Sequence, residues 1–361
     1  MYNNVSTCWS VSEASKLRPR DVSMKVVVFL LFVISASMLT GCTNSEWVLS
    51  ALYNRMDNVM AGETKEYADF TPEQIAEIDL LADQFHQWHR TEHLPLYADL
   101  LLDINSQIEP GETVSRDEVA RWSAQVEGFA REMAECYPLN NAFDLLRNLS
   151  DEQVDQILAH GIKEYDDFIE DRIQDSKKDR VELRYDETKK WFRRFSLNLN
   201  EEQRQHLIET IEKERLIQGE IRAESKAESA REATNDPPAE PEKVVAGIEL
   251  WKLWVEEFVE ILEDRNAPDF EAIVGEHIHS LWNLQYDKFP EVIDYNRQLW
   301  ITYFYELAES QTPEQRQAFS NWLVKMASNI DGIASRRTKS AELPTLETTQ
   351  ICKATIANRV I

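Results

Sequence analysis

Apolar residues recur at every third or fourth position along most of this chain, the spacing that places them on one face of an α-helix. One such series follows Thr71 and consists of Ile75, Ile78, Ala82, Phe85 and Trp88. Alternating apolar and polar runs, which would indicate strands, are scarce, and the 361 residues include only 9 glycines. The pattern therefore predicts an all-α fold, either an irregular multi-helix bundle or an array of helical hairpins.

The same periodicity predicts where the helices lie. In the first half of the chain they are expected at residues 46–61, 71–93, 94–107, 115–135, 139–147 and 150–175. In the second half they are expected at residues 178–197, 200–231, 243–264, 268–285, 288–309 and 312–333.

Four of these helices follow the same short motif, FTPEQ at 70–74, LSDEQ at 149–153, LNEEQ at 199–203 and QTPEQ at 311–315. The second residue of the motif can accept a free backbone N–H as an N-cap, and the glutamine can bond back to the cap and close a capping box. The predicted N-caps are Thr71, Ser150, Asn200 and Thr312. Their unequal spacing argues against a uniform solenoid.

Composition suggests a boundary late in the chain. Residues 233–242, ATNDPPAEPE, form a polar, Pro-rich linker. We expect an N-terminal helical subdomain over 42–232 and a C-terminal helical subdomain over 243–335. Residues 336–361 are polar and aperiodic, and a loose tail is expected there.

Residues 24–42, MKVVVFLLFVISASMLTGC, combine a basic residue, a short apolar run and an ending in small residues. The run is too short for a permanent membrane helix, so it indicates a secretory signal. Its ending resembles the bacterial lipobox, with Cys42 as the acylated residue and the new N-terminus. Residues 1–41 are then a signal peptide, with Met24 as an alternative true start. An ordinary signal peptide that happens to contain a cysteine is the other interpretation.

A lipid on Cys42 would tether the protein, because each buried methylene contributes roughly 0.8 kcal/mol and two or three chains, such as palmitate, anchor stably. Thr43 stands where an Asp would resemble an inner-membrane retention signal. We therefore expect a lipoprotein of the bacterial cell envelope, with the outer membrane favoured and the chain facing the periplasm.

The chain is acidic, with 65 Asp and Glu against 39 Lys and Arg and a formal net charge of −26. This charge argues against nucleic-acid binding, which needs a cationic surface, and against broad contact with anionic lipid. Basic partners or divalent cations fit better, although solubility alone also accounts for the charge. In the oxidising envelope Cys136 and Cys352 are expected either to form a disulfide or to remain as two thiols.

The segment 83–97, DQFHQWHRTEHLPLY, carries three histidines. On one helix His86, His89 and His93 share a face, which makes them a candidate zinc or copper site. The zinc-protease pattern His-Glu-x-x-His is absent, however, and Glu92 points away from this face. The favoured interpretation is structural, with imidazoles at a core edge that bond to a carboxylate or to a carbonyl.

Pro95 removes the usual helical donor for the carbonyl of Thr91, so a kink or break is expected there. His277 and His279 are two residues apart and should face different ways. Close carboxylates such as Asp166 and Asp167 are expected on solvated helix faces.

No nucleophile elbow, phosphate loop or CxxC motif is present. An enzyme is therefore less expected than a binding protein, and no cofactor is expected besides the lipid. Tryptophans in the last third of the chain are expected in the core, or alternatively in an apolar groove for a partner helix or extended chain. They are Trp251, Trp254, Trp282, Trp300 and Trp322.

A longer series of residues follows Cys42: WVLSALYNRMD at 47–57, FTPEQ at 70–74, then Trp88, His89, Arg90, Glu92, Pro95 and Tyr97. Together they resemble a family of uncharacterised proteobacterial lipoproteins. The resemblance implies location and an all-helical fold, with those last six residues as a structural signature. It implies no activity. His93 stands where an acidic residue is expected, which weakens a three-histidine ligand set. The capped helix starts also resemble, more weakly, the Leu-Thr-x-x-Gln repeats of periplasmic helical chaperones.

Two hypotheses follow. The first is a non-enzymatic binding, scaffold or chaperone-like protein on the periplasmic side of the envelope, with an envelope protein as its partner. The second is a metal-binding or hydrolytic protein centred on His86, His89 and His93.

Overall fold

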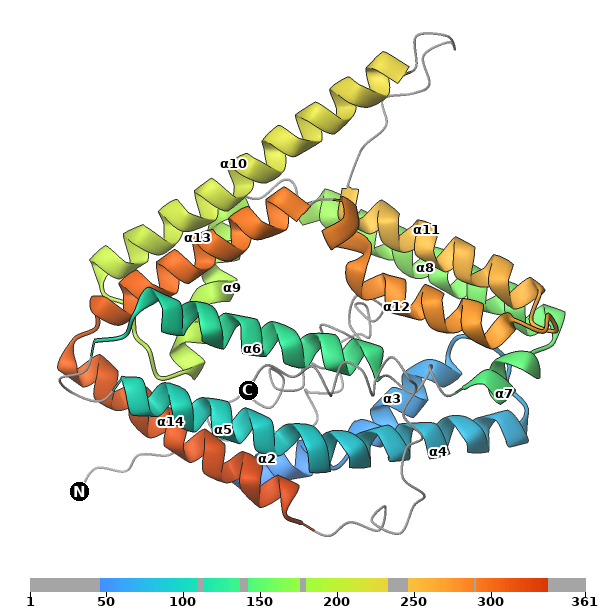
Figure 1. Cartoon of the computed structure of the whole chain (residues 1–361), viewed down its shortest axis with the longest axis horizontal. Helices are drawn as coiled ribbons and strands as arrows, with labels where there is room; N and C mark the ends of the chain where they lie inside the picture. Colours follow the sequence, from blue (N-terminus) through green and yellow to red (C-terminus); the bar gives the residue numbers. More distant parts are fainter. Residues whose placement is uncertain are drawn as a thin grey trace, which may run out of the picture.

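The computed structural model describes residues 46–108, 113–136, 142–175, 180–232, 246–288 and 290–336. Within these ranges the backbone forms helices and connecting turns without a β-strand (Figure 1). The predicted all-α, multi-helix fold is confirmed. Among the described helices, none is both long and apolar enough to cross a membrane. The expected leader and Cys42 lie outside the described residues.

The helix bounds follow the predicted ones closely. The first half of the chain holds α2 (Glu46–Tyr53), α3 (Met56–Lys65), α4 (Pro72–Trp88), the π-helical turn η2 (His89–His93), α5 (Leu94–Gln107), α6 (Arg116–Glu135), α7 (Phe143–Arg147) and α8 (Asp151–Asp175). The second half holds α9 (Arg180–Arg194), α10 (Glu201–Glu232), α11 (Ala246–Glu263), α12 (Phe270–Lys288), α13 (Pro290–Glu309) and α14 (Pro313–Ala334).

Some helix ends differ from the predicted ones by three or four residues, since α7 begins at Phe143, α9 ends at Arg194 and α12 ends at Lys288. Two further differences change the course of the chain. The segment 46–61 is divided at Asn54 and Arg55 into α2 and α3. At the site of the expected kink or break near Pro95 the chain forms a π-helical turn, in which the backbone N–H of Leu94 bonds to the carbonyl of His89. A π-helical turn accommodates one extra residue, so the chain passes from α4 to α5 without interruption.

Figure 1 shows α4, η2 and α5 as one long rod along the lower edge of the view. Helix α14 packs along α5, and α3 packs on α4. Helices α8, α11 and α12 gather at one end of the rod, and α9, α10 and α13 gather above the other end. Helix α6 runs between the two groups and contacts both α12 and α13.

Three clusters of buried apolar side chains hold this arrangement together. One joins α3, α4, α7 and α8 to α11 and α12, a second joins α2, α5 and α6 to α13 and α14, and a third joins α9 and α10 to α13. Helices from both sides of residues 233–242 thus share every cluster. The two predicted subdomains do not have separate cores, and 233–242 and 337–361 lie outside the described residues.

At all four predicted helix starts the N-cap side chain accepts the backbone N–H of the motif glutamine. The distances are 3.3 Å at Thr71, 3.2 Å at Ser150, 2.9 Å at Asn200 and 3.2 Å at Thr312. Each glutamine side chain also accepts the N–H of its cap. Ser115 caps α6 in the same way, a cap that was not predicted.

The glutamines of these caps also join helices in pairs. Gln74 and Gln153 donate to each other's side-chain oxygen over 3.2 and 2.7 Å. Gln203 and Gln315 do the same over 3.2 and 2.9 Å. Every member also donates to the carbonyl two residues before its partner's cap, at Asn148, Asp69, Ser310 and Asn198 respectively. The N-termini of α4 and α8, and those of α10 and α14, are thereby fastened together.

Candidate functional site

The signature residues meet around η2, where the middle of the long rod contacts α2, α6 and α14. His86 is 6 % exposed, His89 7 %, Arg90 1 % and His93 0 %. Trp88 is also buried, and its ring lies 4.5 Å from that of His93. Residues four apart lie on the same face of a helix. The rings of His89 and His93 stack there, with centroids 5.7 Å apart and planes 17° apart.

Five side chains around η2 form a continuous polar series, the histidine–tyrosine chain: Tyr53, His89, Tyr97, His93 and Glu132. The Tyr53 hydroxyl lies 2.8 Å from Nδ1 of His89, and Nε2 of His89 lies 3.3 Å from the Tyr97 hydroxyl. That hydroxyl lies 3.3 Å from Nδ1 of His93, and Nε2 of His93 lies 3.2 Å from Oε2 of Glu132. The chain thus runs from α2 to α6 through η2 and α5.

Each neutral imidazole has one N–H donor and one acceptor nitrogen. With the proton of both histidines on Nε2, the Tyr53 hydroxyl donates to Nδ1 of His89, Nε2–H of His89 donates to the Tyr97 hydroxyl, and that hydroxyl donates to Nδ1 of His93. Nε2 of His93 then faces the carboxyl group of Glu132, which is 3 % exposed, across a contact of 3.2 Å that lacks hydrogen-bond geometry.

Burial favours these neutral histidines. The loss of hydration, and then the charges of His93, His86 and Arg90, hold the pKa of His89 well below its usual range. Burial and then Arg90 lower the pKa of His86 to about 4. Nδ1 of His86 is 4.0 Å from the Asp57 carboxylate, too far for a hydrogen bond.

Arg90 bonds the ends of two helices, α2 and α14, to η2. Its guanidinium donates to the carbonyl of Ile333 over 2.9 Å and to the side-chain oxygen of Asn54 over 2.6 Å. It also lies over the Tyr53 ring, 4.8 Å from the centroid. One arginine thus joins the end of α2, the middle of the rod and the end of α14. Arg336 adds a second link through Ser50, at 2.9 Å.

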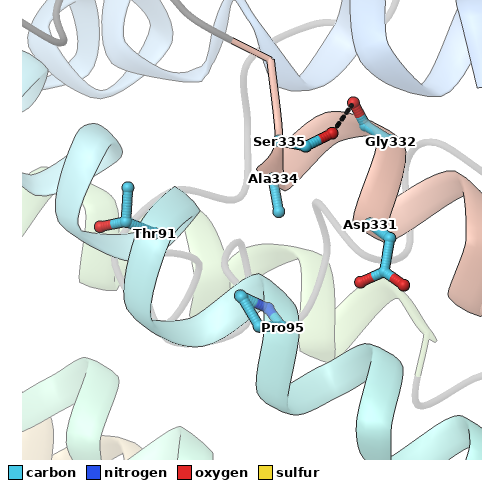
Figure 2. Close-up of a pocket in the computed structure, with 6 residues that line it drawn as sticks. All are labelled: Thr91, Pro95, Asp331, Gly332, Ala334 and Ser335. Atoms are coloured by element: carbon cyan, nitrogen blue, oxygen red, sulfur yellow. Dashed lines mark hydrogen bonds between the residues drawn. The ribbon is translucent and has the colours of Figure 1, made fainter.

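Next to Arg90 the rod and α14 leave a shallow hollow of about 490 Å³. Figure 2 shows Thr91 and Pro95 on one side, and Asp331, Gly332, Ala334 and Ser335 on the other. The Ser335 hydroxyl donates to the carbonyl of Gly332. Glu92, the remaining signature residue, is exposed and takes no part in the buried cluster.

The predicted metal ligands do not converge. Both ring nitrogens of His89 face tyrosine hydroxyls, and one nitrogen of His93 faces Glu132. Within the part of the chain that the structure describes, no group of three or more His, Cys, Asp or Glu is arranged to hold a metal ion.

His277 and His279 face different ways. His277 stacks on Trp254, and its Nε2 lies 2.9 Å from the Trp254 carbonyl oxygen, while the Trp254 indole N–H donates to the carbonyl of His277. His279 lies 3.2 Å from Glu135 of α6. Asp166 and Asp167 are exposed on α8. These histidines and carboxylates belong to helix contacts and solvated faces.

The described tryptophan side chains are buried or half-buried, and none is exposed. Trp254 and Trp322 belong to apolar clusters, and Trp300 is half-buried beside Phe304. Trp254 and Trp322 are therefore core residues. The side chains of Trp251 and Trp282 lie outside the described residues.

Cys136 is 2 % exposed and disulfide-bonded. Cys42 and Cys352 lie outside the described residues, so the pairing of Cys136 with Cys352 stays a prediction.

Periodicity and motif spacing did not point to three contributors to the buried cluster. Tyr53 and Asn54 drew attention only through the family resemblance, although adjacent polar residues at a helix end next to a buried stripe are a usable signal. Glu132 carries no local signal, because only the packing of α6 brings it to His93.

No curated protein matches the chain, and no solved structure matches it. A family of unknown function, DUF6279, matches residues 66–232, which hold most of the buried cluster and three of the four capped helix starts.

Proposed function

We propose that this protein is a lipid-anchored envelope protein on the periplasmic side, with the outer membrane favoured, and that it acts as a non-enzymatic binding scaffold. The proposal combines the lipobox-like ending at Cys42 with the way in which the first described helix is held.

The observation that carries the proposal is the attachment of α2 to the body. Only residues 43–45 separate Cys42 from the start of α2 at Glu46. At about 3.6 Å per residue this segment spans at most ~14 Å. Tyr53, Asn54 and Ser50 of α2 and the turn after it then bond to His89, Arg90 and Arg336. A lipid anchor so close to a helix that is bonded to the body would restrict how the body is oriented at the membrane. A restricted orientation suits a scaffold.

The chemistry of the η2 region also favours binding over catalysis. Its imidazoles and hydroxyls pair with one another, and His93 and Glu132 are almost completely buried. The hollow of Figure 2 is lined by Thr91, Pro95 and the end of α14, and none of the histidines is among its lining residues. The metal-binding or hydrolytic alternative gains no support from this arrangement, and a chaperone-like role gains little from tryptophans that lie in the core.

The test is chemical crosslinking in intact cells, followed by mass spectrometry of the captured proteins. The matched control is Cys42→Ser, which keeps the whole folded chain and removes the lipid acceptor. A dominant envelope partner that is captured by the wild type and lost with Cys42→Ser supports a tethered scaffold. A wide spread of unfolded outer-membrane proteins would instead indicate a chaperone. An empty capture by both forms would overturn the proposal.

A further inference from the structure

The outward side of α2 and α3 differs from the rest of this acidic chain. Leu49, Tyr53, Met56 and Met60 face the body and are buried. The residues between them that point outward include Leu52, which is 44 % exposed, Val59, which is 37 % exposed, and the exposed Arg55.

These three residues lie on one side of the helix pair. The backbone N–H of Arg55 bonds to the carbonyl of Leu52, and the N–H of Val59 bonds to the carbonyl of Arg55. Backbone hydrogen bonds at steps of three and four residues continue through the turn at Asn54 and Arg55, and all three side chains are on the exposed side of the segment. The opposite side of α3 packs on α4, and that of α2 packs on α14. Leu52, Arg55 and Val59 therefore form one stripe, the α2–α3 stripe.

Acidic residues are sparse in the middle of this segment. Between Glu46 and Glu63, which lie in α2 and α3 themselves, residues 47–62 contain a single acidic residue, Asp57, in a chain with 65 Asp and Glu. The Asp57 side chain is only 17 % exposed, lies near His86 and hydrogen-bonds to Asp83. The stripe thus presents two apolar side chains and one cation, while the Asp57 carboxylate of the same segment is largely buried.

We infer that the α2–α3 stripe rests on the bilayer surface, with Leu52 and Val59 in the interfacial region and Arg55 at the lipid phosphates. The inference rests on the proposed lipid anchor at Cys42, which would hold α2 within the reach calculated above. Amphipathic helices bind the interface through an apolar face, and arginine guanidinium pairs well with phosphate.

The size of the stripe favours a bilayer over a protein partner. A stable protein interface buries about 800 Å² on each partner and is built around large anchor residues. One leucine, one valine and one arginine offer much less. Beside an acyl anchor such a stripe needs only to orient the body, since the lipid chains already supply the binding.

The experiment places a photoreactive phenylalanine analogue at Leu52 or at Val59 of the full-length protein. Leu216 and Leu253, which are 57 % and 52 % exposed on α10 and α11, serve as matched positions far from α2 (Figure 1). Each protein is reconstituted in vesicles of phosphatidylethanolamine and phosphatidylglycerol and irradiated. Mass spectrometry then counts phospholipid adducts at the label and the acyl chains on Cys42.

The expected result is several-fold more phospholipid adduct at positions 52 and 59 than at 216 and 253. Equal yields at all four positions, with acylated Cys42, would overturn the inference and leave the anchor intact. Crosslinks from positions 52 and 59 to protein, including a second copy, would overturn it as well. A Cys42 without lipid would remove the proposed function and this inference with it.

Discussion

The hydroxyl of Tyr53 in α2 lies 2.8 Å from Nδ1 of His89 in η2, across 36 residues of chain. This contact joins the helix nearest the proposed lipid anchor to the histidine–tyrosine chain that ends at Glu132. The fixed attachment of α2 to the body depends on this contact.

Tyr53→Phe should lower the free energy of unfolding by about 1–2 kcal/mol, because Nδ1 of the buried His89 loses its donor. Urea titration of the lipid-free protein measures the change. Tyr303→Phe is the matched control. Tyr303 is 1 % exposed, and its hydroxyl has no hydrogen-bond partner within the described ranges, so its removal should cost little. Equal losses in the two variants would mean that the Tyr53 hydroxyl has no special role.

Acid should weaken the fold through His86. Its pKa falls from an ordinary 6.5 to about 4 in the folded protein, chiefly through burial and then through Arg90. The His86 imidazole of the unfolded chain therefore takes up a proton below about pH 6.5, whereas that of the folded chain takes it up only near pH 4. The free energy of unfolding should fall between these values. In His86→Gln the fall should be shallower, and an unchanged slope would contradict this assignment.

Asp83 should act in the opposite sense. Burial and the hydrogen bond to Asp57 raise its pKa from 3.8 to about 6, so the folded chain takes up this proton first. Protonation of Asp83 adds stability as the pH falls from about 6 to 3.8. Asp83→Asn should therefore make the acid loss of stability steeper than in the wild type. A shallower slope in this variant would refute the prediction.

The glutamine pairs should be energetically coupled. Gln74→Ala and Gln153→Ala should each lower the free energy of unfolding by about 1–2 kcal/mol, since each leaves a buried partner unsatisfied. The double variant should cost less than the sum, because both substitutions remove the same bonds. Glu118→Ala is the control, as Glu118 closes the capping box of α6 with Ser115. Additive losses for the glutamine pair would contradict coupling.

Cys136 offers a test of the predicted disulfide. If Cys352 is its partner, Cys352→Ser should release one thiol at Cys136, which maleimide labels after unfolding without reductant. Wild-type protein from the envelope should take up no label at Cys136, which is disulfide-bonded in the structure. If Cys136 stays unlabelled in Cys352→Ser, the predicted pairing is wrong.

The local features of this fold could be predicted from the sequence. The bounds of α5, α6 and α14 differ from the predicted ones by one residue at most, because helical periodicity and N-cap chemistry act within a few residues. The caps at Thr71, Ser150, Asn200 and Thr312 depend only on their own first turn.

The contacts between distant segments could not be predicted. Gln74 meets Gln153 across 79 residues, and Gln203 meets Gln315 across 112. Such pairs depend on how whole helices pack, which periodicity does not specify. The π-helical turn at His89 depends both on Pro95 and on the packing of the surrounding core. Glu132 reaches His93 only because α6 runs beside the rod at that point.

Mass spectrometry of the N-terminal peptide of the protein purified from membranes decides whether Cys42 is the anchor. We expect a peptide that begins at Cys42 and carries a diacylglycerol thioether and a further acyl chain. A peptide that extends upstream of Cys42, or one that begins there without lipid, would contradict the proposed anchor.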